Sequence, residues 1–204
     1  MSMKTRDIRV SPQPIRNRQC RVAAFELLHR HGDAVAAQIA DDALATDQVI
    51  HLVYDGAGRG RQALHGLPGF INVDAEMLFS SRIESLPTTE VVLELLETVR
   101  VDERVICRCA DLKRRGFHLA LDDVCDCREE YTPLFDLADI VKVDLPSLDD
   151  EHLELLVREL RRFPLQLLAE KVDSSQCAQR CVDLQFDLFQ GYHFDPPVPA
   201  PASA

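Results

Sequence analysis

Short apolar runs, each ending at or just before a polar residue, recur along the chain. They read VAAFE, GFIN, VVLE, HLALDD, IVK, LQLLAE and LFQ. The runs are rich in Val, Ile, Leu and Phe and too short for independent helices, which favours buried parallel strands. From Asn72 onward the polar ends recur at steps of 22, 28, 20, 28 and 20 residues. Such steps fit one strand, one helix and two loops, so the pattern predicts an α/β fold of the TIM-barrel-like (β/α)8 type, in a small version.

The segments outside these runs predict a hairpin and a series of helices. Residues 11–30 are typical of a hairpin with residues 16–19 as its polar turn, so the first strand should run antiparallel. A Ser147 cap should begin one helix, and Gly116 should end another. Helices are expected at 33–50, after the glycine-bearing loop 56–64, and at 74–79, 102–115, 147–162 and 174–184.

Length and composition indicate one domain. With 204 residues the chain is near the lower size limit of an eight-stranded barrel, and its 46% apolar content is ample for one core. We expect an N-terminal tail at residues 1–11, a barrel domain at 12–195 and a Pro/Ala-rich tail at 196–204. A second domain has no room.

Charge and cysteine content exclude several classes of partner. A formal charge of −11 argues against binding long nucleic acid, although a small phosphorylated ligand held by metal is permitted. No run approaches the roughly 18 apolar residues of a membrane span, and the start lacks a signal-peptide core, so we expect a cytoplasmic protein with no membrane partner. The seven cysteines are interpreted as reduced thiols, because CxC spacing is a weak zinc signal.

The polar residues at the strand ends are the candidate chemistry. In such a barrel the carboxyl ends of the strands converge on one face. Carboxylates gathered there repel one another unless they hold cations, and carboxylate oxygens with one amide suit Mg²⁺ or Mn²⁺. The eight candidates are Glu26, Asn72, Glu94, Asp122, Asp123, Lys142, Glu170 and Gln190.

Seven segments, taken in order, resemble the signature segments of the EAL-domain family of bacterial cyclic-di-GMP phosphodiesterases. They are FELLHR, FINVD, VVLELLE, LALDD, IVKVDL, LLAEKVD and FQGYHF. The resemblance runs from about Pro12 to Phe194, and implies an EAL barrel. AEKVD and YTPLFDLADIVKVDL are most similar to the EAL-like half of the EAL-HDOD subgroup, and we expect the HDOD half to be absent.

The resemblance implies a role for each candidate. Two divalent cations would make a water nucleophilic and clamp the charge on the phosphate, yielding linear pGpG. The implied metal ligands are Glu26, Asn72, Glu94, Asp122, Asp123 and Glu170, with Asp122 shared and Asp123 on the second cation. The implied catalytic residues are Glu26, Lys142, Glu170 and Gln190, of which Lys142 would orient the attacking water or steady the transition-state charge. The implied contacts to cyclic-di-GMP are Gln13, Arg30 and Asp144.

The chain departs from the active family pattern in ways that leave two functions open. DDVCDCREEY replaces the usual glycine-rich loop, so Glu129 or Glu130 would have to substitute for the loop glutamate. Lys171 replaces the glycine after the last acidic ligand. The first hypothesis is a phosphodiesterase, which would pair as a homodimer. The alternative is a catalytically degenerate EAL domain that senses cyclic-di-GMP or docks a signalling protein.

Overall fold

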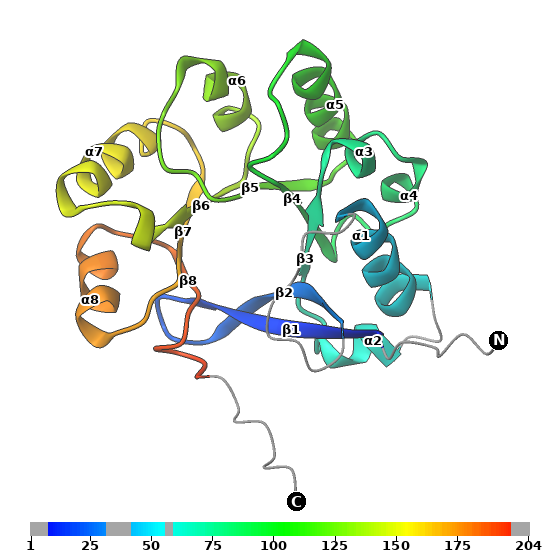
Figure 1. Cartoon of the computed structure of the whole chain (residues 1–204), viewed down its shortest axis with the longest axis horizontal. Helices are drawn as coiled ribbons and strands as arrows, with labels where there is room; N and C mark the ends of the chain where they lie inside the picture. The colour runs from blue at the N-terminus through cyan, green and yellow to red at the C-terminus, as the bar shows by residue number, and fades with distance from the viewer. Residues whose placement is uncertain (1–7, 32–41, 56–58, 197–204) are drawn as a thin grey trace, which may run out of the picture.

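A closed barrel of eight strands lies at the centre of the chain in this computed structural model, and helices surround it (Figure 1). The structure describes residues 8–31, 42–55 and 59–196. Each strand pairs with the next in sequence, and β8 pairs with β1 to close the barrel. The strands are β1 (Ile8–Asn17), β2 (Val22–His31), β3 (Gly69–Val73), β4 (Val91–Leu95), β5 (His118–Leu121), β6 (Ile140–Asp144), β7 (Gln166–Glu170) and β8 (Leu188–Phe189). The predicted (β/α)8 architecture is confirmed.

The helices lie outside the barrel wall (Figure 1). They are α1 (Asp42–Ile50), α2 (Arg59–Ala63), α3 (Ala75–Leu78), α4 (Ser81–Glu84), α5 (Glu103–Arg114), α6 (Thr132–Phe135), α7 (Asp150–Leu160) and α8 (Ser175–Asp183). A π-helical turn follows α1 at His51–Asp55, and 3-10 turns lie at Glu129–Tyr131 and Leu145–Ser147. Of the helix expected at 33–50, residues 33–41 lie outside the described residues, as do positions 56–58 and 197–204. Among the described residues, no helix combines the length and the hydropathy that a membrane span requires.

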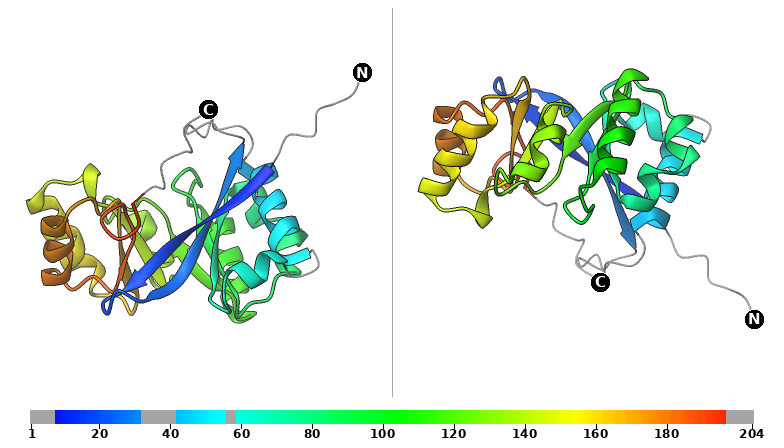
Figure 2. Two further views of the ribbon diagram at one scale, coloured as in Figure 1. Left: turned by 90° about the horizontal axis from the view of Figure 1, so that it is seen from below. Right: turned by 90° about the horizontal axis from the view of Figure 1, so that it is seen from above.

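The first two strands form the predicted hairpin. Strand β1 runs antiparallel to both β2 and β8, whereas the other neighbouring strands run parallel. Figure 2 shows these two long strands crossing the barrel diagonally. β1 begins at Ile8, inside the expected N-terminal tail, because its first residues pair with the end of β2. The turn predicted at residues 16–19 begins too early, because residues 16 and 17 still belong to β1 and pair with β8.

Strands β3 to β8 are buried on both faces over most of their length. One apolar side chain from each strand fills the barrel interior: Ile15, Ala24, Phe70, Val92, Ala120, Ile140, Leu168 and Leu188. The next residue along a strand, such as Ile71 or Leu93, packs instead in the larger cluster formed with the helices. Because successive side chains point to opposite faces and both faces are covered, the strands appear in sequence as continuous apolar runs.

Helix α7 begins later than its sequence indicated. The predicted cap, Ser147, lies in a 3-10 turn and donates its hydroxyl to Asp144 Oδ2 at 2.5 Å. Asp149 caps the helix instead, accepting from the backbone N–H of His152 at 2.9 Å. A side-chain oxygen at this position satisfies one of the free N–H groups of the first turn. The Ser147 prediction was therefore wrong, because its hydroxyl is engaged with β6.

Candidate active site at the carboxyl ends of the strands

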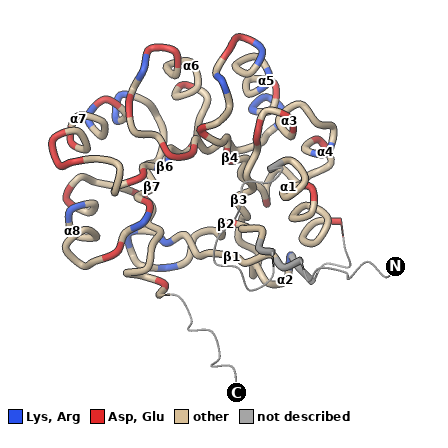
Figure 3. Tube along the Cα trace, in the orientation of Figure 1, with Lys and Arg blue, Asp and Glu red and all other residues tan. Residues whose placement is uncertain are grey.

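Seven of the eight candidate residues follow an interior core residue by two positions. The pairs are Ala24 and Glu26, Phe70 and Asn72, Val92 and Glu94, Ala120 and Asp122, Ile140 and Lys142, Leu168 and Glu170, and Leu188 and Gln190. Because a strand alternates its faces, the second member points into the same interior, one layer nearer the carboxyl ends. Figure 3 shows acidic positions around the centre of the barrel as well as on the outer helices. The structure thus brings these seven residues together.

Lys142 lies at the centre of this cluster. Its Nζ is 2.5 Å from Glu94 Oε1, 2.8 Å from Asp122 Oδ1 and 2.9 Å from Glu170 Oε1. A fourth carboxylate, Glu26, lies 3.9 Å away through Oε1. The Lys142 side chain is 2% exposed and that of Glu94 is fully buried. One ammonium group therefore faces four carboxylates with almost no access to solvent.

The charges in this cluster shift one another's pKa values. Burial opposes the charged form of Lys142, but the surrounding carboxylates outweigh it and hold its pKa well above the usual range. Burial raises the pKa of Glu94 well above its usual range, against the effect of Lys142. Burial likewise raises the pKa of Glu170 to about 8. Since a single ammonium cannot balance four carboxylates in a low dielectric, the cluster favours an added proton or cation.

Several buried oxygen atoms in the cluster fit a cation. Asn72 Oδ1, Glu94 Oε2 and Glu170 Oε2 have no hydrogen-bond partner in the part of the chain that the structure describes. Asn72 and Glu94 are register neighbours on β3 and β4. The hydroxyl of Thr46 in α1 donates to the backbone carbonyl of Asn72 at 2.7 Å. Buried polar atoms are normally paired, and hard oxygen atoms of this kind are ligands of divalent cations. The residues present therefore fit one such ion.

Glu26 is hydrogen-bonded by Gln190, which follows β8, and faces Gln13 in the register with β1. Gln190 donates from Nε2 to Glu26 Oε2 at 2.6 Å, and both residues are buried. Gln13 of β1 lies directly opposite Glu26 in the antiparallel register and is partly buried. Arg30, also expected to contact substrate, has its backbone in β2, but its side chain lies outside the described part of the structure.

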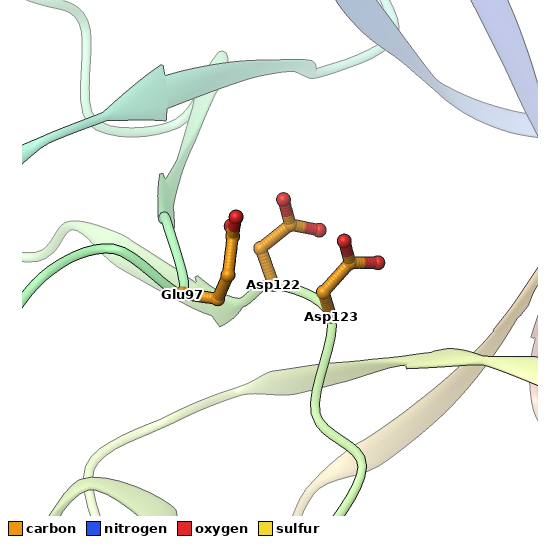
Figure 4. Close-up of side chains that lie close together, drawn as sticks. All are labelled: Glu97, Asp122 and Asp123. Carbon is orange, nitrogen blue, oxygen red and sulfur yellow. The ribbon is translucent and has the colours of Figure 1, made fainter. Parts of the chain in front are cut away.

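A second group of carboxylates lies at the rim of the site. Oxygen atoms of Glu97, Asp122 and Asp123 lie within 4.8 Å of one another (Figure 4). Glu97 is exposed in the turn after β4, beyond the apolar run, so the strand-end pattern did not select it. The expected substitutes Glu129 and Glu130 are instead exposed in a 3-10 turn. The sequence signal that could have identified Glu97 is its position, three residues after Glu94.

Lys171 approaches this rim from the end of β7. Its Nζ lies 2.9 Å from Asp144 Oδ1 and 3.7 Å from Asp123 Oδ1. Partial burial disfavours the charged Lys171, but its bond to Asp144 and the nearby carboxylates raise its pKa overall. Partial burial raises the pKa of Asp123, and the charge of Asp122 adds to this effect. Asp144, expected to contact substrate, is thus bound by Lys171 and by Ser147.

The chain is thus a (β/α)8 barrel with one antiparallel strand, and the carboxyl ends of its strands carry an acidic site that fits a divalent cation. The chain belongs to the EAL domain family, whose profile matches residues 2–197. The resemblance inferred from the sequence is confirmed.

Two curated relatives match most of the chain. It is 30% identical over 192 residues to the uncharacterized protein YuxH of Bacillus subtilis, a match covering 92% of this chain and 47% of YuxH. It is 29% identical over 199 residues to CdgJ of Vibrio cholerae, named a cyclic di-GMP phosphodiesterase, covering 92% of this chain and 44% of CdgJ. The chain therefore spans about half the length of these relatives.

Solved structures share the barrel. The EAL-domain protein YkuI of Bacillus subtilis, crystallised with its substrate c-di-GMP and calcium, superimposes with a TM-score of 0.75 at 20% identity. The match covers 97% of this chain and 56% of YkuI. At this level of identity the likeness establishes the fold.

Proposed function

We propose that this chain is a metal-dependent phosphodiesterase that hydrolyses cyclic-di-GMP to linear pGpG. The observation that carries the proposal is a set of three buried oxygens, on Asn72, Glu94 and Glu170, that have no hydrogen-bond partner among the described residues and lie beside a lysine already bound by carboxylates. The name of CdgJ and the ligand of YkuI support cyclic-di-GMP as the substrate. Calcium in the YkuI complex supports a divalent cation in the site.

The proposed cation is Mg²⁺ or Mn²⁺, held by the three unpartnered oxygens together with Glu26 and Asp122. When bound, such an ion lowers the pKa of a water and offsets charge on the phosphate oxygens. The five ligand residues lie at the ends of five different strands, so a small shift of one loop does not disperse them.

The remaining residues orient the reactants and handle the proton. Lys142, fixed by its carboxylate neighbours, directs a positive charge towards the interior, where negative charge develops on the phosphate. Glu170, whose carboxylate lies 2.9 Å from Lys142, would accept a proton from a water beside the cation. Gln190 fixes the Glu26 carboxylate through its 2.6 Å hydrogen bond. Gln13, opposite Glu26 in the strand register, is the residue that we expect to contact the substrate on this side.

The test is chromatography of cyclic-di-GMP incubated with the purified chain and Mn²⁺ or Mg²⁺. Glu94→Gln keeps the shape of the side chain and removes its charge, so pGpG formation should fall by about 100-fold or more. Glu154→Gln is the control, because Glu154 lies on the outer helix α7 with its side chain 57% exposed. Equal pGpG formation by Glu94→Gln and the parent would contradict the proposal.

A nucleotide sensor is the second candidate, and the rim of the site favours it. Residues 125–130, which follow the two aspartates, are exposed, and Asp123 faces Lys171. In that case calorimetry would detect binding of cyclic-di-GMP by the parent, and chromatography would detect no pGpG. A signalling scaffold would give neither signal.

A further inference from the structure

We propose that the ammonium group of Lys171 takes the place of a second divalent cation, so that this chain holds one divalent cation beside a built-in positive charge. The inference deepens the proposed function, and rests on it, because it concerns how the same site is charged. It departs from the sequence expectation that Asp123 ligates a second metal ion.

The contacts of Lys171 carry the first step. Its Nζ lies 2.9 Å from Asp144 Oδ1 and 3.7 Å from Asp123 Oδ1. Asp123 follows β5, Asp144 ends β6 and Lys171 follows β7, so three neighbouring strands bring these groups together. The ammonium therefore lies between two carboxylates at the rim, where a cation shared by them would otherwise lie.

The two lysines divide the carboxylates between them. Lys142 binds Glu94, Asp122 and Glu170 in the interior, and Lys171 binds the pair at the rim. Of the three residues grouped at the rim, Asp122 and Asp123 each pair with a lysine, and only Glu97 has no ion pair among the described residues. The interior oxygens for which the described residues offer no hydrogen-bond partner belong to Asn72, Glu94 and Glu170, and they stay available for a first cation.

The backbone also points to a specific placement of this lysine. Lys171 has φ 56°, in the left-handed region where a glycine is unstrained and a lysine is not. Asp123, the residue it faces, has φ 45°. Two non-glycine residues thus keep unfavourable backbone conformations at the point where their side chains meet, as occurs where surrounding structure or function requires it.

Like charges then disfavour a second ion. A divalent cation bound by Asp122 and Asp123 would lie within a few ångströms of the Lys171 ammonium. The Lys171 side chain is 54% exposed, so it keeps its charge and part of its hydration. Repulsion and loss of the ion pair with Asp144 would both weaken binding of that second ion.

The test is a calorimetric Mn²⁺ titration of the whole purified chain, compared with Lys171→Met, Lys171→Gly and Lys113→Met. Methionine removes the charge and keeps the length, whereas glycine also relieves the positive φ. Lys113 is a matched control, because its partner Asp139 lies at the amino ends of β5 and β6, at the opposite end of the strands from the site. We expect one Mn²⁺ for the parent and for Lys113→Met, and two for both Lys171 variants, with affinity for the second ion at least about tenfold higher.

Magnetic coupling between two bound Mn²⁺ ions, measured by electron paramagnetic resonance, should appear only in the Lys171 variants. Two ions in the parent, one ion in Lys171→Met, or a second ion in Lys171→Gly alone would each overturn the inference.

Failure of the proposed function has a different signature. A parent that forms no pGpG but changes from one to two ions on substitution would refute the phosphodiesterase and leave the inference standing, whereas a parent that binds no ion would refute both.

Discussion

Lys142 keeps a charged ammonium group in a place where its side chain is 2% exposed. Removing an ion from water is costly, and only the surrounding carboxylates offset that cost. In turn, Glu94 and Glu170 stay near one another because the ammonium lies between them. At the scale of single residues, the site is therefore a set of charges that depend on one another.

Replacing Lys142 tests this dependence. Without added metal, Lys142→Met should lower the free energy of unfolding by about 3 to 5 kcal/mol, because it leaves buried carboxylates without a counter-charge. Mn²⁺ should recover part of this loss by supplying the missing positive charge. Urea denaturation with and without Mn²⁺ measures both effects.

The control is Lys113→Met, which breaks the partly exposed pair with Asp139 and should cost about 1 kcal/mol or less. Equal losses from the two variants would show that the central lysine adds nothing beyond an ordinary surface pair.

The titration of Glu170 makes stability depend on pH. Burial raises its folded pKa to about 8 from an ordinary value of 4.5. Between these values the folded chain binds more protons than the unfolded chain, so the free energy of unfolding of the metal-free protein falls as pH rises through this window. Glu94 shifts in the same direction. Calorimetric Tm values should decline from about pH 5 to about pH 8, and Mn²⁺ should oppose the decline at the upper end.

The matched variant for this pH effect is Glu170→Gln, which cannot titrate and should flatten the profile. Asp55 and Glu84 do not oppose the trend, because their arginine partners hold their pKa values below the window. A metal-free Tm that rises towards about pH 8 would contradict the expected sign.

At the scale of elements, β8 is short and depends on the segment that follows it. It has two residues, after which Gln190 and Gly191 continue along β7. The Gln190 N–H donates to the Ala169 carbonyl at 2.9 Å, and its own carbonyl accepts from Val172 at 3.0 Å. Gly191 has φ 151°, and a side chain there would overlap the backbone of Val172. The close approach that places Gln190 in the site therefore requires glycine.

Gly191→Ala should lower the free energy of unfolding by about 3 kcal/mol or more, because backbone strain and overlap with Val172 add together. Gly66→Ala is the matched control, since Gly66 also has positive φ, 79°, but open space around it, and should cost about 1 kcal/mol. Chemical denaturation compares the two variants. Equal costs would show that only backbone conformation matters at position 191.

At the scale of the whole molecule, the barrel closes through a small contact. β1 and β8 share two register pairs, involving residues 16 and 17 of β1. Arg16 adds a two-pronged contact to Asp195, from Nε to Oδ2 at 2.9 Å and from Nη2 to Oδ1 at 2.6 Å. This ion pair ties the hairpin at the start of the barrel to the segment after its last strand.

Arg16→Ala should lower the free energy of unfolding by about 1 to 3 kcal/mol, since paired charge-assisted hydrogen bonds are among the stronger side-chain contacts. It should also speed amide hydrogen exchange in β1 and β8 more than in β4. Arg162→Ala, which removes a 73% exposed arginine paired with Glu159, is the control and should change little. If amide exchange in β1 and β8 is equally fast in Arg16→Ala and in the parent, the ion pair with Asp195 does not stabilise the closure of the barrel.

The barrel, its antiparallel first strand and the polar residues at the carboxyl ends of its strands were predictable from the amino-acid sequence. Period-two alternation within each strand is local, so it already places Glu94 in the same interior as Val92 and Glu170 in the same interior as Leu168. Regular spacing of strand and helix then aligns the carboxyl ends at one face. The starts of the helices at Asp102 and Ser174 were also predictable, because each side chain caps the backbone N–H three residues later in the chain.

How groups from different loops meet depends on the tertiary structure. Glu97 joins the two aspartates, and Lys171 binds Asp144. These contacts join segments whose backbone follows no repeating pattern, and their geometry depends on the path of each loop over the barrel rim. The polar residue that ends each apolar run thus marks the site in the sequence. Packing of the rim decides which other charges that residue meets.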